Sequence, residues 1–230
     1  MNLRYKKTTI SFIFLILAIS CVSAEPTKTV IPETQVSESS SLLDVPVGEP
    51  PVVDGVLSPN EWVDAAHMTM SDGSDLYWLY ANDLLYLAVK TLNIGAVNLA
   101  IQNEDQVRIL HSSAALGSAI YEKRGDGWHL TQNFSWCCRS TISFDESEQL
   151  FQDEGWLATI GYLGAPGEVE FQLVLPDGEV KVAVSNISAD SSVSFWPEDL
   201  SQSAVEQLRG ERNEFEDFLI DQWVTIIIPD

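Results

Sequence analysis

Apolar and polar residues alternate through residues 75–91, DLYWLYANDLLYLAVKT, which constrains the fold more than any other feature of the chain. In an extended chain this alternation places Leu76, Trp78 and Tyr80 on one face. Residues 81–83, Ala-Asn-Asp, follow as a turn, and alternation resumes beyond them. The second run places on one face Leu85, Leu87 and Val89. The pattern therefore predicts a β-hairpin.

Further strand-like segments follow, separated by turn sequences such as RGDG at 124–127 and PDG at 176–178. The segments are 96–103, 106–113, 117–123, 128–136, 167–176, 179–187 and 222–229. Many short strands with few helices indicate an all-β fold, an antiparallel β-sandwich of the immunoglobulin-like or jelly-roll type.

Short helices are expected in three places. In PVVDGVLSPNEW, residues 51–62, Ser58 and Glu61 form a capping box and Pro59 suits the first helical position, so we expect a helix ending near Ala66. Trp62 would lie on its inner face and close one end of the core. The other helices are the beginning of 145–160 and residues 199–209, where the box is Ser203 with Glu206 and the stop is Gly210.

The first 24 residues have the order of a secretory signal peptide. Arg4, Lys6 and Lys7 precede the apolar run at 10–20, which is too short to span a bilayer comfortably. The sequence therefore predicts an exported protein, secreted or lipid-anchored at the cell surface.

Two ways of processing the signal peptide stay open. Val22 and Ala24 fit ordinary cleavage before Glu25, whereas Ser20 directly before Cys21 fits lipidation of Cys21, as in a bacterial lipoprotein. Residues 25–42 are rich in Pro, Thr, Ser and Glu and are expected to form a disordered tether. Residues 43–230 suffice for one domain.

The chain is strongly acidic. Removing residues 1–24 takes away three basic residues and no acidic ones, which moves the net charge from −22 to −25. Nucleic acid is therefore excluded as an expected partner, and a membrane is expected only through a lipid anchor.

Cysteine is scarce. Apart from Cys21, the 230 residues contain only the adjacent pair Cys137 and Cys138, which excludes a disulfide-stapled scaffold. In an oxidising compartment the pair could form a vicinal disulfide, bridge two chains or remain thiols. Two neighbouring sulfurs without further ligands do not make a zinc cage.

The order of these motifs resembles the family 9 carbohydrate-binding modules and the wider DOMON-like group of sandwiches. That family opens with Val-Asp-Gly, an acidic helix and a Trp, as residues 52–62 do here. It continues with a hairpin ending in Leu-Tyr and with Asp-x-Val-x-Ile, here residues 105–109. Two strands and a Trp-Pro turn, here FWPEDL at 195–200, complete an order that covers 51–229.

The sugar clamp of that family is not carried over. The resemblance implies a stacking Trp three residues before the Asp of Asp-x-Val-x-Ile and a Glu at the fourth position of the motif. This sequence has Gln102 and Arg108 there, and no aromatic residue between Pro197 and Phe215 replaces the second tryptophan of the clamp.

Residues 128–139, together with Trp156, supply aromatic rings that could replace the clamp. Trp128, Trp136 and Trp156 can stack on a sugar ring, while Arg139, Gln132 or Asn133 could bond its hydroxyls. The alternative is core packing, because alternation places Trp128 and Trp136 on one strand face together with Leu130 and Phe134. The expected ligand-binding residues are Gln102, Arg108, Trp128, Trp136, Arg139 and Trp156.

Other chemistry receives less support. His111 next to Ser112 and Ser113 lacks a nucleophile elbow, so we expect no enzyme. Asp72 and Asp75 could offer oxygen atoms to calcium but lack the full spacing of a calcium loop.

The expected function is that of a non-catalytic binding module for carbohydrate or glycan, without a cofactor. Two alternatives stay open. One, implied by the resemblance to the DOMON-like group, is a haem-binding redox domain with axial ligands from His67, Met68, Met70 or His111. The other is an interaction module of a surface lipoprotein.

Overall fold

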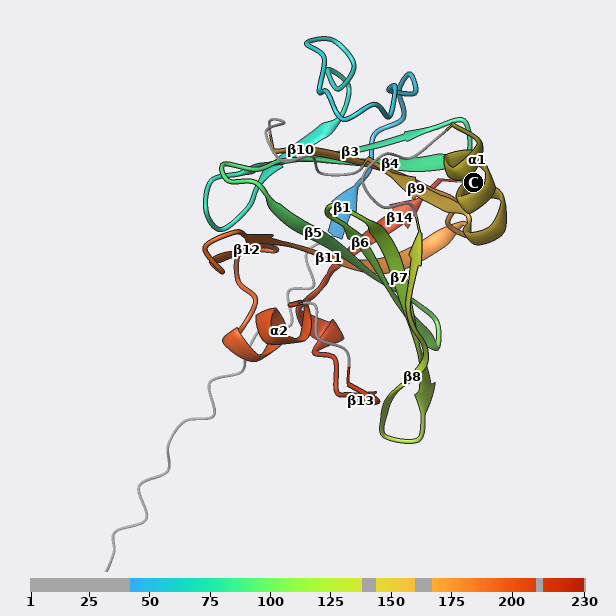
Figure 1. Ribbon diagram of the computed structural model, residues 1–230, viewed down its shortest axis with the longest axis vertical. Coiled ribbons are helices and arrows are strands. Elements are labelled where there is room, and N and C mark those ends of the chain that lie inside the picture. Colours follow the sequence, from blue (N-terminus) through green and yellow to red (C-terminus); the bar gives the residue numbers. More distant parts are fainter. Residues whose placement is uncertain (1–41, 138–143, 160–166, 210–212, 230) are drawn as a thin grey trace, which may run out of the picture. The chain divides into compact units, whose positions relative to one another are not determined.

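The computed structural model describes residues 42–137, 144–159, 167–209 and 213–229. Within them the chain forms two β-sheets packed face to face, with two short α-helices beside them (Figure 1). The all-β sandwich predicted from the alternating segments is therefore confirmed. The predicted signal peptide and all but the last residue of the predicted tether lie outside the described residues.

The larger sheet has nine strands, and eight of them lie in the order β1-β14-β11-β5-β6-β7-β8-β13, with β12 paired to β11. Neighbours run antiparallel except for β1 and β14, which are parallel. Its strands are β1 Leu42–Asp44, β5 Gly95–Asn103, β6 Gln106–Ser112, β7 Leu116–Arg124, β8 Gly127–Cys137, β11 Gly178–Ser188, β12 Val193–Trp196, β13 Phe215–Glu216 and β14 Val224–Ile228.

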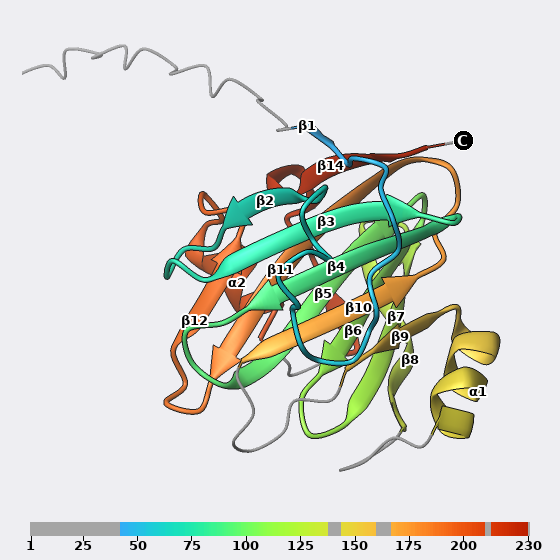
Figure 2. The ribbon, with the colours of Figure 1, turned by 90° about the horizontal axis from the view of Figure 1, so that it is seen from above.

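The smaller sheet has five antiparallel strands in the order β2-β3-β4-β10-β9 (Figure 2). Asn82 and Asp83 have positive φ values of 51° and 62° and form the predicted turn between β3 and β4. The strands are β2 Ala66–Thr69, β3 Asp75–Ala81, β4 Leu84–Lys90, β9 Trp156–Ala158 and β10 Glu168–Leu173. The sequence patterns missed the strands of four residues or fewer, which are too short to show a periodicity.

The main core lies between the two sheets. The alternating residues of β3 and β4 face those of β5 and β11, and the indole rings of Trp78 and Trp196 meet at 5.8 Å between centroids. Burial of these side chains is the main force that holds the layers together.

The outer face of the smaller sheet is covered by residues 49–65, which cross it before β2 begins (Figures 1 and 2). Trp62 packs there in one cluster with Leu79 and Tyr86. The prediction that Trp62 closes one end of the core is therefore wrong, because it covers the outer face of a sheet.

The predicted helix from Ser58 to Ala66 is also wrong, because the segment forms consecutive turns. Half of the predicted capping box exists: the Glu61 carboxylate accepts a 3.1 Å hydrogen bond from the Ser58 amide. Hydrogen bonds to Glu168 and Glu170 hold the start of the segment on β10, and β2 begins at Ala66. The few residues between these two points form only local turns.

The outer face of the larger sheet is covered by residues 198–209 and 213–223, which include α2 Gln202–Gln207 and a 3-10 turn, η1 Ile220–Gln222. Phe218 and Trp223 pack against β-strand residues such as Tyr121 and Trp128. The N-cap of α2 is Ser201, whose hydroxyl accepts from the Ala204 amide, and not the predicted Ser203.

The helix predicted at the beginning of 145–160 is confirmed as α1, Phe144–Glu154, which precedes β9. Its last residue, Glu154, bonds to side chains of the larger sheet. The helix therefore lies beside the end of the sandwich formed by β6, β7 and β9.

Candidate functional site

An aromatic surface lies near the end of β8. The Trp136 side chain is 46% exposed, and its ring stacks on Phe134 at 4.8 Å between centroids and 30° between planes. His111, on β6, meets Trp136 edge-on at 5.2 Å. We call Phe134, Trp136 and His111 the aromatic platform.

A glycine creates the space for the platform. Gly117 of β7 is paired with Trp136 across the strands. A Cβ atom at Gly117 would lie 2.8 Å from Cε3 of Trp136 and 3.1 Å from Cδ1 of Phe134. The two rings therefore lie directly on the backbone of β7, which fixes a large aromatic surface in place.

A chain of polar groups holds His111 in position. Asn98 is fully buried on β5; its Nδ2 donates to the carbonyl of Leu208 at 2.9 Å, which turns its Oδ1 toward His111 Nδ1, 2.7 Å away. His111 Nδ1 must donate this bond, so in the neutral imidazole Nε2 is an acceptor. Nε2 lies 2.9 Å from the Ser113 hydroxyl.

The two serines beside His111 differ in orientation. Ser112 is buried and its hydroxyl donates to the carbonyl of Thr159, away from His111. Ser113 follows the end of β6, and the turn brings its hydroxyl to the imidazole. The platform thus combines exposed rings with a hydroxyl that a hydrogen-bonded chain orients.

Gln102 and Trp128, two of the predicted binding residues, line one groove of about 650 Å³ on the outer side of the larger sheet. Trp128 is only 6% exposed because Phe218 covers it. The Lys123 ammonium lies 5.7 Å from the centre of its ring. The groove therefore presents charged and amide groups, while its tryptophan is almost fully buried.

Arg108 and Trp156 meet elsewhere, at the carboxylate of Glu154. This carboxylate accepts from Trp156 Nε1 at 2.8 Å and from the Ser118 hydroxyl at 2.7 Å, and the Arg108 guanidinium lies 3.4 Å away. Burial lowers the pKa of Arg108, and the nearby carboxylate of Glu154 opposes this shift. This network ties α1 and β9 to the larger sheet.

The predicted residues therefore do not form one site. In the β5–β6 hairpin Gln102 is opposite Val107 and Ile101 is opposite Arg108, which places Gln102 and Arg108 on opposite faces of the larger sheet. Trp136 is separate from both groups, and Arg139 lies outside the described residues. His111 and Ser113 were missed as binding residues, although their spacing of two residues would have indicated a shared side.

The candidate haem ligands do not converge. Met70 is 1% exposed in the main core, and Met68 packs against that core. His67 stacks on Tyr77 beside the smaller sheet, whereas His111 belongs to the platform on the larger sheet. These four side chains do not face a common space that would hold a haem between two of them.

The candidate calcium ligands have other partners. Asp72 accepts from the Ser74 amide at 2.9 Å, and Asp75 pairs with His67 at 2.8 Å. Within the described parts of the chain, no three His, Cys, Asp or Glu side chains group so that they could hold a metal ion.

Cys137 is disulfide-bonded. Its partner lies outside the described residues, as do both other cysteines of the sequence, Cys21 and Cys138. Of the three states expected for the cysteine pair, free thiols are thereby excluded for Cys137.

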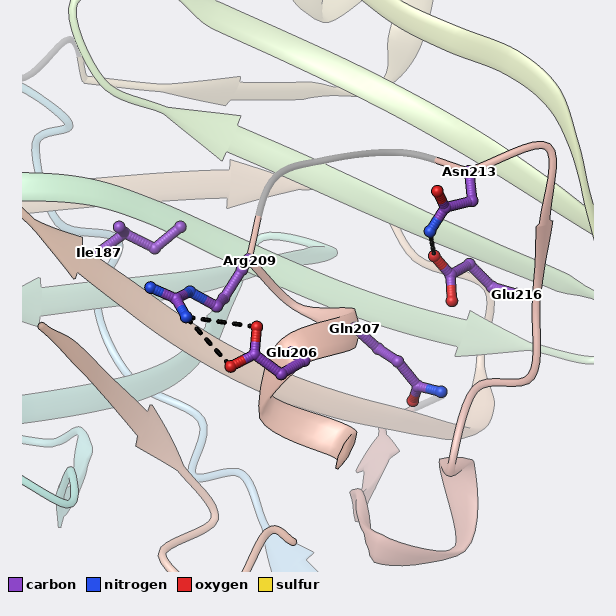
Figure 3. Close-up of a pocket in the computed structure, with 6 residues that line it drawn as sticks. All are labelled: Ile187, Glu206, Gln207, Arg209, Asn213 and Glu216. Atoms are coloured by element: carbon purple, nitrogen blue, oxygen red, sulfur yellow. Dashed lines mark hydrogen bonds and ion pairs between the residues drawn. The ribbon is translucent and has the colours of Figure 1, made fainter. Parts of the chain in front are cut away.

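A further hollow of about 480 Å³ lies beside α2 (Figure 3). Figure 3 shows Arg209 turned onto Glu206, with Nη1–Oε1 3.0 Å, and Asn213 turned onto Glu216. Arg209 is thus paired with Glu206 and Glu216 with the neutral Asn213, and none of the described residues that line the hollow is aromatic.

No family model and no curated protein matches this sequence. Two solved structures are similar to the chain, each at 10% sequence identity. One is a family 9 carbohydrate-binding module from Caldicellulosiruptor kristjanssonii in complex with cellotriose, with a TM-score of 0.44 over 81% of this chain and 93% of that one. The other is a candidate carbohydrate-binding protein from Bacteroides uniformis, with a TM-score of 0.41 over 82% of this chain and 99% of that one.

Neither α1 nor α2, the helices of the described residues, is long and apolar enough to span a membrane.

Proposed function

We propose that this chain is an exported, non-catalytic carbohydrate-binding module and that the aromatic platform is its principal binding surface. The observation that carries the proposal is the exposure of Trp136, which is 46% accessible although its neighbours on β8 and β7 hold it in a fixed position. The order of the sequence motifs, which resembles the family 9 modules, supports the same ligand class.

The platform has the chemistry that sugar recognition needs. One face of a pyranose ring presents C–H groups that pack on an aromatic ring, and its edge presents hydroxyls that need directed partners. Trp136 supplies the ring, and the Ser113 hydroxyl beside His111 supplies a polar partner. Because Asn98 is buried and already bonded, His111 needs little reorganisation when a ligand binds.

Export also belongs to the proposal. The segment at 1–24 would direct the chain out of the cytoplasm, and residues 25–42 would separate the domain from a membrane if Cys21 carries a lipid. Mass spectrometry of the N-terminal peptide from the native host tests this part. A diacylglycerol on Cys21 supports anchoring, and a mature chain that begins at Glu25 contradicts it.

Calorimetry of the full chain, guided by a glycan array, tests the binding function. We expect W136A to weaken binding of the best glycan by at least about tenfold, which corresponds to about 1.4 kcal/mol. Phe215 offers a matched control: its side chain is 47% exposed, and its ring lies edge-on to His129 at 5.3 Å beside Gly127, outside the platform.

The variant F215A is therefore expected to bind like the wild type. If no glycan binds, or if F215A weakens binding as much as W136A does, the platform is not the sugar site.

A further inference from the structure

The loop at residues 54–58 is held by carboxylates at every backbone N–H. Glu170 Oε2 accepts from Asp54 and Gly55 at 3.0 and 2.7 Å. The remaining three bonds run from Val56 to Asp54 at 2.9 Å, from Leu57 to Glu168 at 3.0 Å and from Ser58 to Glu61 at 3.1 Å. Five consecutive amides are thus fixed by four acidic side chains.

This anchoring requires the burial of charge. Glu170 has no exposed surface, and Glu168 has 8% of its side chain exposed. Desolvation of a carboxylate is unfavourable, and it raises the pKa of Glu170 although three N–H donors oppose the shift. The result is a loop whose position on the smaller sheet is defined before any ligand arrives.

The other side of this loop is the wall of a hollow of about 290 Å³ on the outer face of the smaller sheet. Its apolar lining comes from Leu57 and Pro59 of the loop region and from the rings of Trp62 and Tyr77. The hollow is lined by residues that include Leu57, Ser58, Pro59, Trp62, Tyr77 and Lys90.

The aromatic side of the hollow is fixed by stacking. Tyr77, on β3, lies between His67, at 4.8 Å and 20°, and Trp62, at 6.2 Å and 49°. The Trp62 indole is itself tied to Glu170 at 3.2 Å. These contacts leave the rings little freedom to collapse into the hollow.

The polar groups at its rim are suited to hydroxyls. Lys90 Nζ lies 3.0 Å from Glu168 Oε1, and half of the Lys90 side chain is exposed. An ammonium next to a carboxylate offers a donor and an acceptor, the pair that two neighbouring hydroxyls of a sugar require. The hydroxyls of Ser58 and Tyr77 add two further partners, and the pairing of Lys90 with Glu168 leaves no net charge to attract an anion.

We propose that this hollow is a second binding site, for a single neutral pyranose residue. The inference rests on the proposed carbohydrate-binding function and extends it. The platform belongs to the larger sheet and the hollow to the smaller one, on the face away from the shared core. One module would therefore hold two glycan segments on opposite outer faces and bridge them.

Nuclear magnetic resonance of the full chain carrying W136A tests the second site without the first. Titration with methyl glycosides of glucose, galactose and mannose is expected to give saturable shifts at the amides of Leu57 and Ser58 and at the Trp62 indole N–H. The variant Y77F, added to W136A, is expected to weaken this binding at least about threefold through the loss of one hydroxyl.

Y86F is the matched control, because Tyr86 lies in the same cluster behind Trp62, is 4% exposed and does not line the hollow. It should leave the titration unchanged. A wild-type chain that shows no shift with any sugar overturns both sites. If the resonance shifts of the wild-type chain are confined to the platform and vanish in W136A, the second site alone is overturned. The same holds if Y77F and Y86F weaken sugar binding equally.

Discussion

The indole nitrogen of Trp62 donates a 3.2 Å hydrogen bond to Oε1 of Glu170, a residue 108 positions away on β10. The other oxygen of the same carboxylate accepts from Asp54 and Gly55. One buried side chain therefore joins the two ends of the Val-Asp-Gly to Trp motif and fixes the whole segment on the smaller sheet.

Substitution of Glu170 by Gln should change the pH dependence of stability. Burial raises the pKa of Glu170 above its ordinary value of 4.5, so over the interval between the two values the folded chain retains a proton that the unfolded chain has released. The contribution of this group to the free energy of unfolding therefore falls as pH rises through that interval and is constant above it.

Urea unfolding between pH 4.5 and 7.5 measures this effect. The stability of the wild type relative to E170Q is expected to fall as pH rises. A matched variant, E122Q, removes a half-exposed carboxylate on β7 that pairs with Arg124 and serves as the control for loss of a surface carboxylate. A difference between wild type and E170Q that does not vary with pH would contradict the prediction.

Asn98 should matter for both stability and sugar binding. The variant N98A removes the bonds to His111 and Leu208 from a fully buried position, and we expect a loss of about 2–3 kcal/mol in unfolding free energy. Glycan affinity should also fall, because His111 loses the group that orients it. Calorimetry and denaturant titration on the same samples separate the two effects.

Ser185 provides the comparison for Asn98. Its hydroxyl donates to the same Leu208 carbonyl at 3.1 Å and accepts from Asn98 Nδ2 at 3.5 Å, so S185A leaves the bond between Asn98 Oδ1 and His111 in place. S185A should lose about 1 kcal/mol of stability and keep wild-type affinity. Equal affinity losses in N98A and S185A would mean that His111 is not positioned through Asn98.

A side chain at Gly117 should displace the platform. In G117A the new methyl group would lie 2.8 Å from the Trp136 ring, so the ring must move away from β7. We expect an altered near-ultraviolet circular dichroism in the tryptophan region and a glycan affinity reduced at least about fivefold, with a stability loss of about 1–3 kcal/mol. Unchanged dichroism and affinity would show that the ring does not depend on this glycine.

Removal of the Arg108 guanidinium should loosen α1. R108M leaves the Glu154 carboxylate with Ser118 and Trp156 as its remaining donors and removes the bond to the Glu154 carbonyl, which is 2.7 Å long. We expect a loss of about 2–3 kcal/mol, since one partner of a largely buried ion pair is deleted. Hydrogen exchange should show faster exchange of the α1 amides; exchange at the wild-type rate would count against this role of the pair.

Local alternation determined the longer strands. The hairpin at 75–91 was predictable because apolar residues two apart and a turn at Asn82 and Asp83 specify both the pairing and the buried face. The same pattern for β8 placed Trp128 and Trp136 on one face, and it could not tell them apart.

Only the tertiary structure decided what lies over each face. Phe218, from a segment 90 residues further along the chain, covers Trp128, whereas nothing in the described residues covers Trp136 to the same extent. Likewise, no local rule relates Trp62 to Glu170, because the bond depends on how residues 49–65 cross β10. Alternation is a property of neighbours in sequence, but exposure depends on which distant segment packs on the face, and long-range packing makes that choice.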